Sequence, residues 1–421
     1  MLLAVLAATA VAPRGQEAEP PPSDALFAPG VLHQIDLQVH SADWVKLRDN
    51  YLENDYYPAD LTWNGVTVRN VGIRSRGSGS RSARKPGLRV DFDRYAGGQR
   101  FLDLKSLVLD NLTQDHSGIH ESVTMAFYAR LGIPAPREAF ARLVVNGEYV
   151  GLYGMVESVD KDLLARVFGV IDDDTQNDGF LFEYDWIGEW FLTWLGDDLQ
   201  PYKDRFDAKT RESRSDEEKY RPIEQLARII TDTREDRLPA ALADILDLPG
   251  LMRFIAAQNF VAQGDGFLGT WGVNNFYLYR LEGSPRHVVI AWDEDVAFWG
   301  TTFPTNEGHE RHLLMNKLMR VPEYRDLYRA ELRRAVEMAN EQVDGQPWLQ
   351  AAIEGRLALI DTAMREDPNK PYTNGHFDEA AGRMRAYLPA RTAFIACEME
   401  RGPRRCDDMT FGGAGVAAAP R

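Results

Sequence analysis

Apolar and polar residues alternate through much of the first third of the chain, beginning at Leu32, and a period of two is typical of half-buried β-strands. Two such runs flank Asn64-Gly65 and two flank Asn146-Gly147, which predicts two tight hairpins. The runs GLRVDFD and KSLVLDN add two predicted strands between them. From Ser117 to Leu131, apolar residues instead recur at helical spacing. The pattern therefore predicts a mainly antiparallel sheet with one inserted helix.

After Glu157 the apolar spacing becomes helical. A short helix precedes an aromatic and acidic stretch from Asp172 to Lys219, which is predicted to be a loop. Helices then dominate, and one predicted hairpin, NNFYLYRLEG with RHVVIAWDED, interrupts them. The later predicted helices span 313–320, 323–340, 347–365 and 377–398. The sequence thus predicts an α+β protein with a β-rich lobe over 29–157 and a mainly helical lobe over 158–400.

Both ends differ from these lobes. The apolar run from Leu2 to Ala12 is too short to span a bilayer and is typical of a signal-peptide core, so 1–28 is predicted to be a signal-peptide-like segment and linker. The glycine- and alanine-rich residues 401–421 are predicted to be a flexible tail. A signal peptide favours secretion or the cell envelope. There Cys397 and Cys406, the only cysteines, could pair, although two free thiols are equally compatible with the spacing.

Composition excludes some classes of function. Sixty-four Asp and Glu outnumber 48 Lys and Arg, and a net charge of -16 repels nucleic acids and anionic membranes. Common hydrolase, P-loop and zinc motifs are absent from the sequence. His309 and His312 are three residues apart, but without a third ligand they are predicted to be a solvated pair. No nucleic-acid partner and no membrane span are therefore expected.

Cationic and glycine-containing residues follow the strand VRNVGI, and such residues can bind phosphate oxygens through N–H groups, hydroxyls and guanidinium groups. The candidates in this loop are Arg74, Arg76, Gly77 and Ser78. A flexible hairpin tip is the alternative. Lys85 precedes the next strand and is predicted to reach phosphates as a point charge. Glu121 points away from the apolar stripe of its helix and is the candidate partner of Lys85, the alternative being a solvated surface residue.

Polar residues also lie at the ends of the later hairpin. Asn274 and Asn275 precede one predicted strand, Asp293 and Asp295 end the other, and Asp265 lies between two glycines upstream. An amide and a carboxylate delivered to one end of a hairpin suit a hard cation such as Mg²⁺ or Mn²⁺, with phosphates and water completing its shell. An aspartate beside Ile290–Trp292 is costly to bury unless it is paired or bound to metal.

The order of these elements resembles a protein-kinase-like fold, and more specifically the spore coat protein H (CotH) kinase family. The matching stretches include VGIRSRGSGS, RKPGLRVDFD, LGIPAPR, VNGEYVGLY, VDKD, NNFYLYR and AWDEDVAFWG, within roughly residues 35 to 300. The resemblance implies a two-lobed fold, with a β-rich N-lobe carrying one inserted helix and a mainly helical C-lobe. It also implies a secreted atypical kinase that transfers the γ-phosphoryl group of ATP to Ser or Thr of extracytoplasmic or coat proteins.

Site roles follow from the same resemblance. Lys85 would contact the phosphates and Glu121 would orient it. A hinge from Met155 to Ser158, including Glu157, would face adenine, and Asp265 would position or deprotonate the acceptor hydroxyl. The implied metal ligands are Asn275 and Asp293.

Other functions stay open at this stage. The chain could be a catalytically inactive pseudokinase or coat scaffold, or it could transfer a nucleotidyl group to protein. A carbohydrate- or wall-binding module would depend on Trp186, Trp190 and Trp194, whose spacing fits one helical face, but burial against the lobes explains these residues equally well. The stretch from Asp172 to Trp194 has no counterpart in the resemblance and is predicted either to recognise an acceptor protein or to form a lid.

Overall fold

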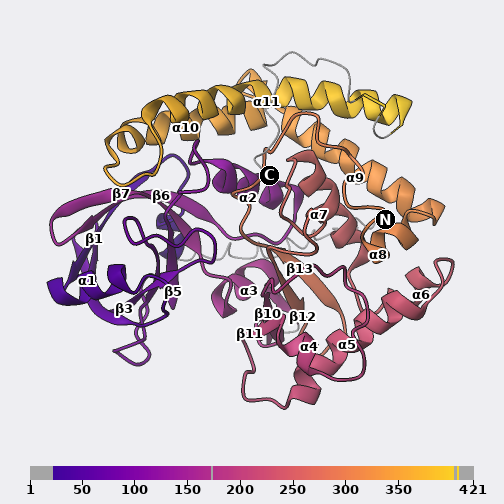
Figure 1. Cartoon of the computed structure of the whole chain (residues 1–421), viewed down its shortest axis with the longest axis horizontal. Helices are drawn as coiled ribbons and strands as arrows, with labels where there is room; N and C mark the ends of the chain where they lie inside the picture. The colour runs from indigo at the N-terminus through magenta and orange to yellow at the C-terminus, as the bar shows by residue number, and fades with distance from the viewer. Residues whose placement is uncertain (1–21, 172–173, 403–404, 407–421) are drawn as a thin grey trace, which may run out of the picture.

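The structure, a computed structural model, describes residues 22–171, 174–402 and 405–406. Most of the predicted signal-peptide-like segment and nearly all of the predicted C-terminal tail lie outside the described residues. The α+β class is confirmed, because a β-rich N-terminal region precedes a mainly helical region (Figure 1).

Seven strands of the N-terminal region form a closed barrel in the order β1-β2-β3-β4-β5-β7-β6. They are β1 (Leu32–Val39), β2 (Tyr57–Trp63), β3 (Val66–Arg76), β4 (Gly87–Asp91), β5 (Ser106–Asp110), β6 (Glu138–Val145) and β7 (Glu148–Glu157). All neighbouring pairs are antiparallel except β1 and β6, whose parallel pairing closes the barrel. The predicted antiparallel sheet is therefore confirmed, whereas its closure was not predicted.

Local sequence signals account for the hairpins. Asn64 and Gly65 have φ of 47° and 77°, and Asn146 and Gly147 have φ of 53° and 84°. Positive φ at both central residues is the type I′ geometry that Asn-Gly favours. The predicted strand at Leu32 ends earlier than expected, because Ser41–Asp49 forms helix α1.

The inserted helix is α2 (His120–Leu131), and Gly132 ends it with φ of 76°. It contacts β6 of the barrel on one side and α7, α9 and α10 on the other. The remaining helices are α3 (Lys161–Phe168), α4 (Gln200–Lys203), α5 (Asp216–Asp232), α6 (Leu238–Leu242), α7 (Leu248–Phe260), α8 (Leu313–Leu318), α9 (Pro322–Asn340), α10 (Trp348–Glu366) and α11 (Asn374–Arg401). Among the described helices, none has the length and apolar character needed to cross a bilayer.

A second sheet lies within the helical region, in the order β11-β10-β12-β13. Its strands are β10 (Phe180–Tyr184), β11 (Phe206–Ala208), β12 (Phe276–Arg280) and β13 (His287–Ala291). Thus the predicted hairpin is confirmed, but the stretch 172–219 is not only loop. The five residues of β10 are mostly buried and lack alternation, so they gave no clear strand signal. The short elements are η1 (Pro22–Ala25), β8 (Val170–Ile171), β9 (Asp174–Thr175), β14 (Gln342–Val343) and β15 (Gln346–Pro347).

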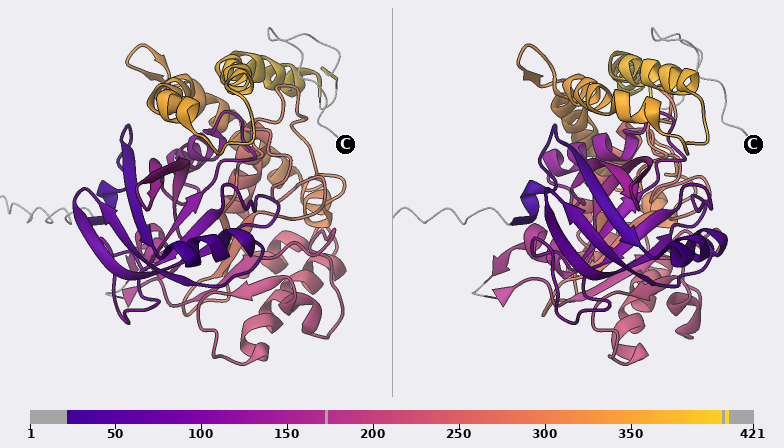
Figure 2. Two further views of the ribbon diagram at one scale, coloured as in Figure 1. Left: turned by 60° about the vertical axis from the view of Figure 1, so that its left-hand side comes forward. Right: turned by 90° about the vertical axis from the view of Figure 1, so that its left-hand side faces the viewer.

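Two large cores are joined by a smaller one. The barrel encloses its own apolar core, and α2 belongs to the core of the helical region. A third cluster brings Val108 and Val156, from the outer face of the barrel, against Tyr277, Ile290 and Trp292 of the second sheet. α10 and α11 lie together across one side of both regions (Figure 2). Side chains of the barrel and of the second sheet therefore share a small apolar core at this cluster.

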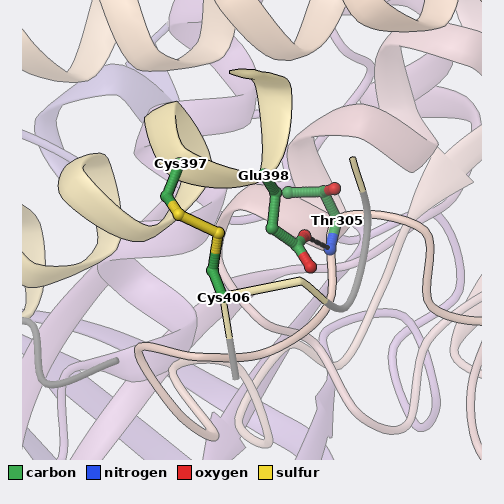
Figure 3. The surroundings of a disulfide bond; sticks show 4 residues. All are labelled: Thr305, Cys397, Glu398 and Cys406. Carbon is green, nitrogen blue, oxygen red and sulfur yellow. Dashed lines mark hydrogen bonds between the residues drawn. A yellow bond between two sulfur atoms is a disulfide. The ribbon is translucent and has the colours of Figure 1, made fainter. Parts of the chain in front are cut away.

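A disulfide and several hydrogen bonds hold the C-terminal half of α11 in place. Cys397 and Cys406 form a disulfide, and the neighbouring Glu398 accepts a hydrogen bond of 2.7 Å from the backbone N–H of Thr305 (Figure 3). Fully buried Arg391 donates to backbone oxygens that include those of Phe260 and Thr301. α11 thus holds the segment that follows β13.

The expected solvated histidine pair is wrong. His309 and His312 are 7% and 0% exposed. The His309 ring packs edge-on against Tyr328, and the His312 ring stacks on Phe267 with centroids 5.4 Å apart. Both rings are core residues because the chain between β13 and α8 folds against α7 and α9.

Candidate active site

The hairpin of β12 and β13 places two predicted metal ligands at one end of the second sheet. Phe276 and Ala291 are paired, so Asn275 directly precedes the hairpin and Asp293 lies two residues beyond it. Both have left-handed backbone, with φ of 54° and 53°. Such conformations cost free energy in residues other than glycine, and they concentrate at functional sites.

Asp265 joins this end of the hairpin. Its carboxylate accepts hydrogen bonds from the side-chain amides of Asn274 (3.1 Å) and Asn275 (3.3 Å), and its carbonyl accepts a second bond from Asn275 (3.0 Å). Burial raises the pKa of Asp265, and the two amides oppose the rise. Burial likewise raises the pKa of Asp293 to about 6, with Arg76 opposing and other carboxylates adding to the rise. The structure therefore brings Asp265, Asn275 and Asp293 together.

A buried polar network supports the loop that carries Asp265. Glu294, which is fully buried, accepts hydrogen bonds from Gln258 (3.0 Å) and Gln263 (2.8 Å). These glutamines in turn accept from the backbone N–H groups of Phe267 and Asp265, both at 3.0 Å. Burial raises the pKa of Glu294 to about 8. The network ties the Asp265 loop to the residue that follows Asp293.

Arg76 is the cation that faces these carboxylates. It ends β3, and its Nη1 lies 3.5 Å from Oδ2 of Asp110 at the end of β5. The guanidinium carbon also lies 5.4 Å from the centre of the Trp292 ring. Burial lowers the pKa of Arg76, but surrounding carboxylates outweigh burial and raise it; they belong to Asp110, Asp293, Glu183 and Glu121. The side chains of Arg76 and Asp110 are 17% and 21% exposed, so this pair is open to a ligand.

The side chain of Lys85 lies near Asp110 but is paired with Asp367, so its predicted pairing with Glu121 is wrong. Its Nζ lies 2.7 Å from Oδ2 of Asp367, and both side chains are almost completely buried. Asp367, which follows α10, also accepts a hydrogen bond from the backbone N–H of Leu152 in β7. The carboxylate fits there because Gly151 has no side chain: a Cβ at that position would lie 2.6 Å from Oδ2 of Asp367. Lys85 therefore braces the barrel to the segment after α10.

Glu121 is not a solvated surface residue either. It is 9% exposed, in the first turn of α2. Burial raises its pKa well above the usual range, and the charges of Glu138, Asp293 and Asp110 raise it further. Glu121 thus belongs to the carboxylates around Arg76, close to the predicted site but without Lys85.

The predicted phosphate loop is only partly directed at the site. Arg74 donates to the side chain of Asn54 and packs over Tyr56, so it is directed to the connection between α1 and β2. Gly77 has φ of 106°, and its carbonyl accepts from Arg81. Ser78 is exposed. Of the four candidates in this loop, Arg76 is the one that meets the carboxylates.

The side chains of Met155 and Glu157 in the predicted hinge contact other parts of the protein. Met155 lies in the barrel core with no exposure, because β5 and β6 flank β7 on both sides. The carboxylate of Glu157 is 1% exposed and is bound by Arg137 (2.7 Å) and Arg166 (2.5 Å). The expected contacts of these two side chains with adenine are therefore not supported by the packing.

Comparison with known proteins places this arrangement in a family. The sequence profile described as CotH kinase protein matches residues 73–395, about three quarters of the chain. The chain belongs to the CotH kinase protein family. Inner spore coat protein H of Bacillus subtilis (strain 168) is 24% identical over 271 residues, which are 63% of this chain and 68% of that protein. Membership in the CotH kinase family implies the use of ATP.

Two solved structures show a distant likeness. The first is the complex of HipA, HipB and operator DNA from Shewanella oneidensis MR-1, with 12% identity and a TM-score of 0.37 over 86% of this chain and 74% of that chain. The second is the proinflammatory kinase CtkA of Helicobacter pylori, with 9% identity and a TM-score of 0.27 over 74% and 95% of the two chains.

Whether this CotH kinase family member can bind a metal ion at the site depends on the ligands that its side chains offer. The described residues contain no group of three or more His, Cys, Asp or Glu side chains that could hold one. Asp293 and Asn275 offer a carboxylate and an amide oxygen, and Mg²⁺ takes only one or two protein ligands when phosphates and water supply the rest. The two residues therefore fit a metal that arrives with a nucleotide.

Sequence reasoning missed several residues of the site. Asp110 ends β5 in the way that Asp293 follows β13, so the signal used for Asp293 also applied to Asp110. Gln258 and Gln263 interrupt the apolar run GLMRFIAAQNFVAQ, and a polar side chain that is buried within an apolar helix needs a partner. Glu294 had no signal of its own, because nothing in the sequence distinguishes it from Asp293 and Asp295.

Proposed function

We propose that this protein is an ATP-dependent kinase that transfers the γ-phosphoryl group to Ser or Thr hydroxyls of proteins outside the cytoplasm. The observation that carries the proposal is the convergence of Arg76, Asp265, Asn275 and Asp293 at one end of the second sheet, in a chain of the CotH kinase family. Three residues come from the helical region and Arg76 comes from the barrel. The proposed nucleotide site therefore lies between the two.

Each residue has a role that its surroundings support. The guanidinium of Arg76 makes one hydrogen bond among the described residues, to Asp110, which leaves donors for phosphate oxygens. Asp265 is held by two amides, and its raised pKa suits it to accept the proton of an acceptor hydroxyl. Positioning and charge stabilisation are most of what phosphoryl transfer requires from a protein.

Asp293 and Asn275 would hold Mg²⁺, or Mn²⁺ in its place. The metal would neutralise charge on the triphosphate. Without it, the charges of Asp110 and Asp265 disfavour the ionised form of Asp293, whereas a hydrogen bond with Asp295 favours it. A bound cation would therefore reverse the rise in the pKa of Asp293.

Secretion or attachment to the cell envelope is part of the proposal. The disulfide between Cys397 and Cys406 suits an oxidising compartment. The apolar run Leu2–Ala12 and the relation to a spore coat protein support the same location. Coat or other extracytoplasmic proteins are the proposed acceptors.

Labelling distinguishes this activity from nucleotidyl transfer. The purified protein is incubated with an extract of extracytoplasmic proteins, Mg²⁺ and ATP labelled at either the γ or the α phosphate. We expect protein-bound label only from γ-labelled ATP, and its loss in Asp293→Asn. Label from α-labelled ATP would instead establish nucleotidyl transfer. Absence of both labels, with no rise in melting temperature on addition of ATP and Mg²⁺, would leave a pseudokinase or scaffold.

A further inference from the structure

Three large apolar side chains are exposed in the loop that carries Asp265 and in the segment that is hydrogen-bonded to it. Trp186, Ile187 and Trp271 are 48%, 53% and 51% exposed, and we call them the aromatic patch. Trp186 and Ile187 lie in residues 185–199, between β10 and α4, which contain no helix, so the predicted helical face of Trp186, Trp190 and Trp194 is wrong. Trp190 is instead 3% exposed and belongs to the core.

The aromatic patch is built rigidly. The indole Nε1 of Trp186 donates to the backbone oxygen of Trp271 at 3.0 Å, and the Trp271 ring lies 6.1 Å from the ring of Trp299. Val273 donates from its backbone to the oxygen of Trp190, and Gly272 fits so closely that a Cβ there would lie 2.6 Å from the same oxygen. The two segments are therefore held together by hydrogen bonds and by the close fit of Gly272, which places Trp186 beside the backbone of Trp271.

The aromatic patch is continuous with the proposed acceptor site. Trp271 lies in the short loop between Asp265 and Asn274, which are hydrogen-bonded to each other. The loop is compact, because Thr270 donates from its backbone to Gly264 (3.0 Å) and Asn274 to Gly266 (3.2 Å). Any polypeptide that presents a hydroxyl to Asp265 must pass close to this loop.

We infer that the aromatic patch is a docking site for the acceptor polypeptide and takes an aromatic or large aliphatic side chain a few residues from the phosphorylated Ser or Thr. The inference rests on the proposed function. Ile187 adds an exposed aliphatic side chain, which suits an apolar side chain better than a sugar. Exposed apolar side chains gathered beside a functional residue mark interaction sites.

Binding and transfer are measured separately to test the inference. The probes are fluorescein-labelled decapeptides that each contain one serine. Each peptide carries one tryptophan at a different position within four residues of the serine, and in the control peptides alanine replaces this tryptophan. We expect the wild type to prefer some tryptophan peptides. Trp186→Ser/Trp271→Ser should weaken their binding roughly tenfold and leave alanine peptides unchanged. Trp186→Phe/Trp271→Phe should restore most of the preference, and Tyr95→Ser, which removes a ring that is 47% exposed on the barrel, should have no effect.

The outcomes separate this inference from the proposed function. If tryptophan peptides bind at the aromatic patch but accept no γ-label, docking stands and the kinase assignment fails. If peptides are labelled but the serine variant binds and phosphorylates them as the wild type does, the docking site is refuted and the kinase assignment stands. Quenching of tryptophan fluorescence by an N-acetylglucosamine hexamer, together with no binding of any peptide, would also refute it in favour of a carbohydrate surface.

Discussion

Two cation–carboxylate pairs lie near the same edge of the barrel, and they differ chiefly in burial. Lys85 and Asp367 are 2.7 Å apart, with side chains 1% and 0% exposed, and they join the barrel to the segment after α10. Arg76 and Asp110 are 3.5 Å apart, 17% and 21% exposed, and both belong to the barrel. In the first pair the charges are sealed by the fold. In the second, part of the guanidinium remains open toward Asp293.

This difference assigns the two pairs to different tasks. A sealed charge that loses its partner keeps the full cost of desolvation, so Lys85 and Asp367 act on stability. Water screens the partly exposed pair of Arg76 and Asp110 more than it screens the sealed pair, so Arg76 should contribute less to stability than Lys85 and can reach a phosphate. Because its side chain is the more exposed of the two cations, Arg76 is the one that we propose for phosphate binding.

Substitution of Lys85 tests the sealed pair and should give the largest effect. Lys85→Met leaves the Asp367 carboxylate buried without its cation, and we expect the free energy of unfolding to fall by about 3–5 kcal/mol. Urea denaturation of the purified variant measures the loss. Lys85→Met/Asp367→Asn removes both charges but keeps a side-chain oxygen for the backbone N–H of Leu152, and it should recover much of the loss. Unchanged stability with selective loss of phosphoryl transfer would give Lys85 the role assigned to Arg76.

Substitution of Arg76 tests the open pair. We expect Arg76→Met to lower the rate of γ-label transfer about 100-fold, equivalent to about 2.7 kcal/mol, because one charge-stabilising group is lost. Its free energy of unfolding should fall by less than that of Lys85→Met, because Arg76 and Asp110 are partly exposed to water. Arg76→Lys should retain part of the activity.

Arg74 provides the matched control, because it lies on the same strand two residues away and contacts Asn54 and Tyr56 instead. Arg74→Met should transfer phosphate as the wild type does. Equal losses in Arg74→Met and Arg76→Met would mean that the whole loop, rather than one guanidinium, binds the nucleotide.

The sequence predicted those parts of the fold that short-range signals determine. Asn-Gly turns specified both hairpins, and helical spacing with Gly132 specified α2. Closure of the barrel could not be predicted, because the paired strands β1 and β6 are separated in the sequence by more than half of the N-terminal region. The strand β10 was missed because its burial depends on β12, which follows much later in the chain.

The candidate site likewise contains some residues whose proximity the sequence predicted and others whose partners it could not predict. Asn275 and Asp293 were predicted to meet because one hairpin connects them, and the structure brings them together. The partner of Lys85 could not be predicted, because Asp367 comes from the far end of the helical region and its fit depends on Gly151. Sequence supplied two plausible cations, and only three-dimensional burial distinguishes the sealed one from the open one.

The ring of His312 is a further sealed group, and its substitution should affect stability less than the substitution of Lys85 does. His312 is fully buried, and burial lowers its pKa from 6.5 to about 3. The unfolded chain therefore binds a proton below pH 6.5 that the folded chain does not, so this residue makes stability fall as the pH drops from 6.5 toward 3. Between pH 7 and pH 5 its contribution amounts to about 2 kcal/mol. We expect His312→Phe, measured by urea denaturation at both pH values, to abolish that part of the loss. His40→Phe, at an exposed position, should retain it, and an identical pH dependence in wild type and His312→Phe would show that the ring is not sealed.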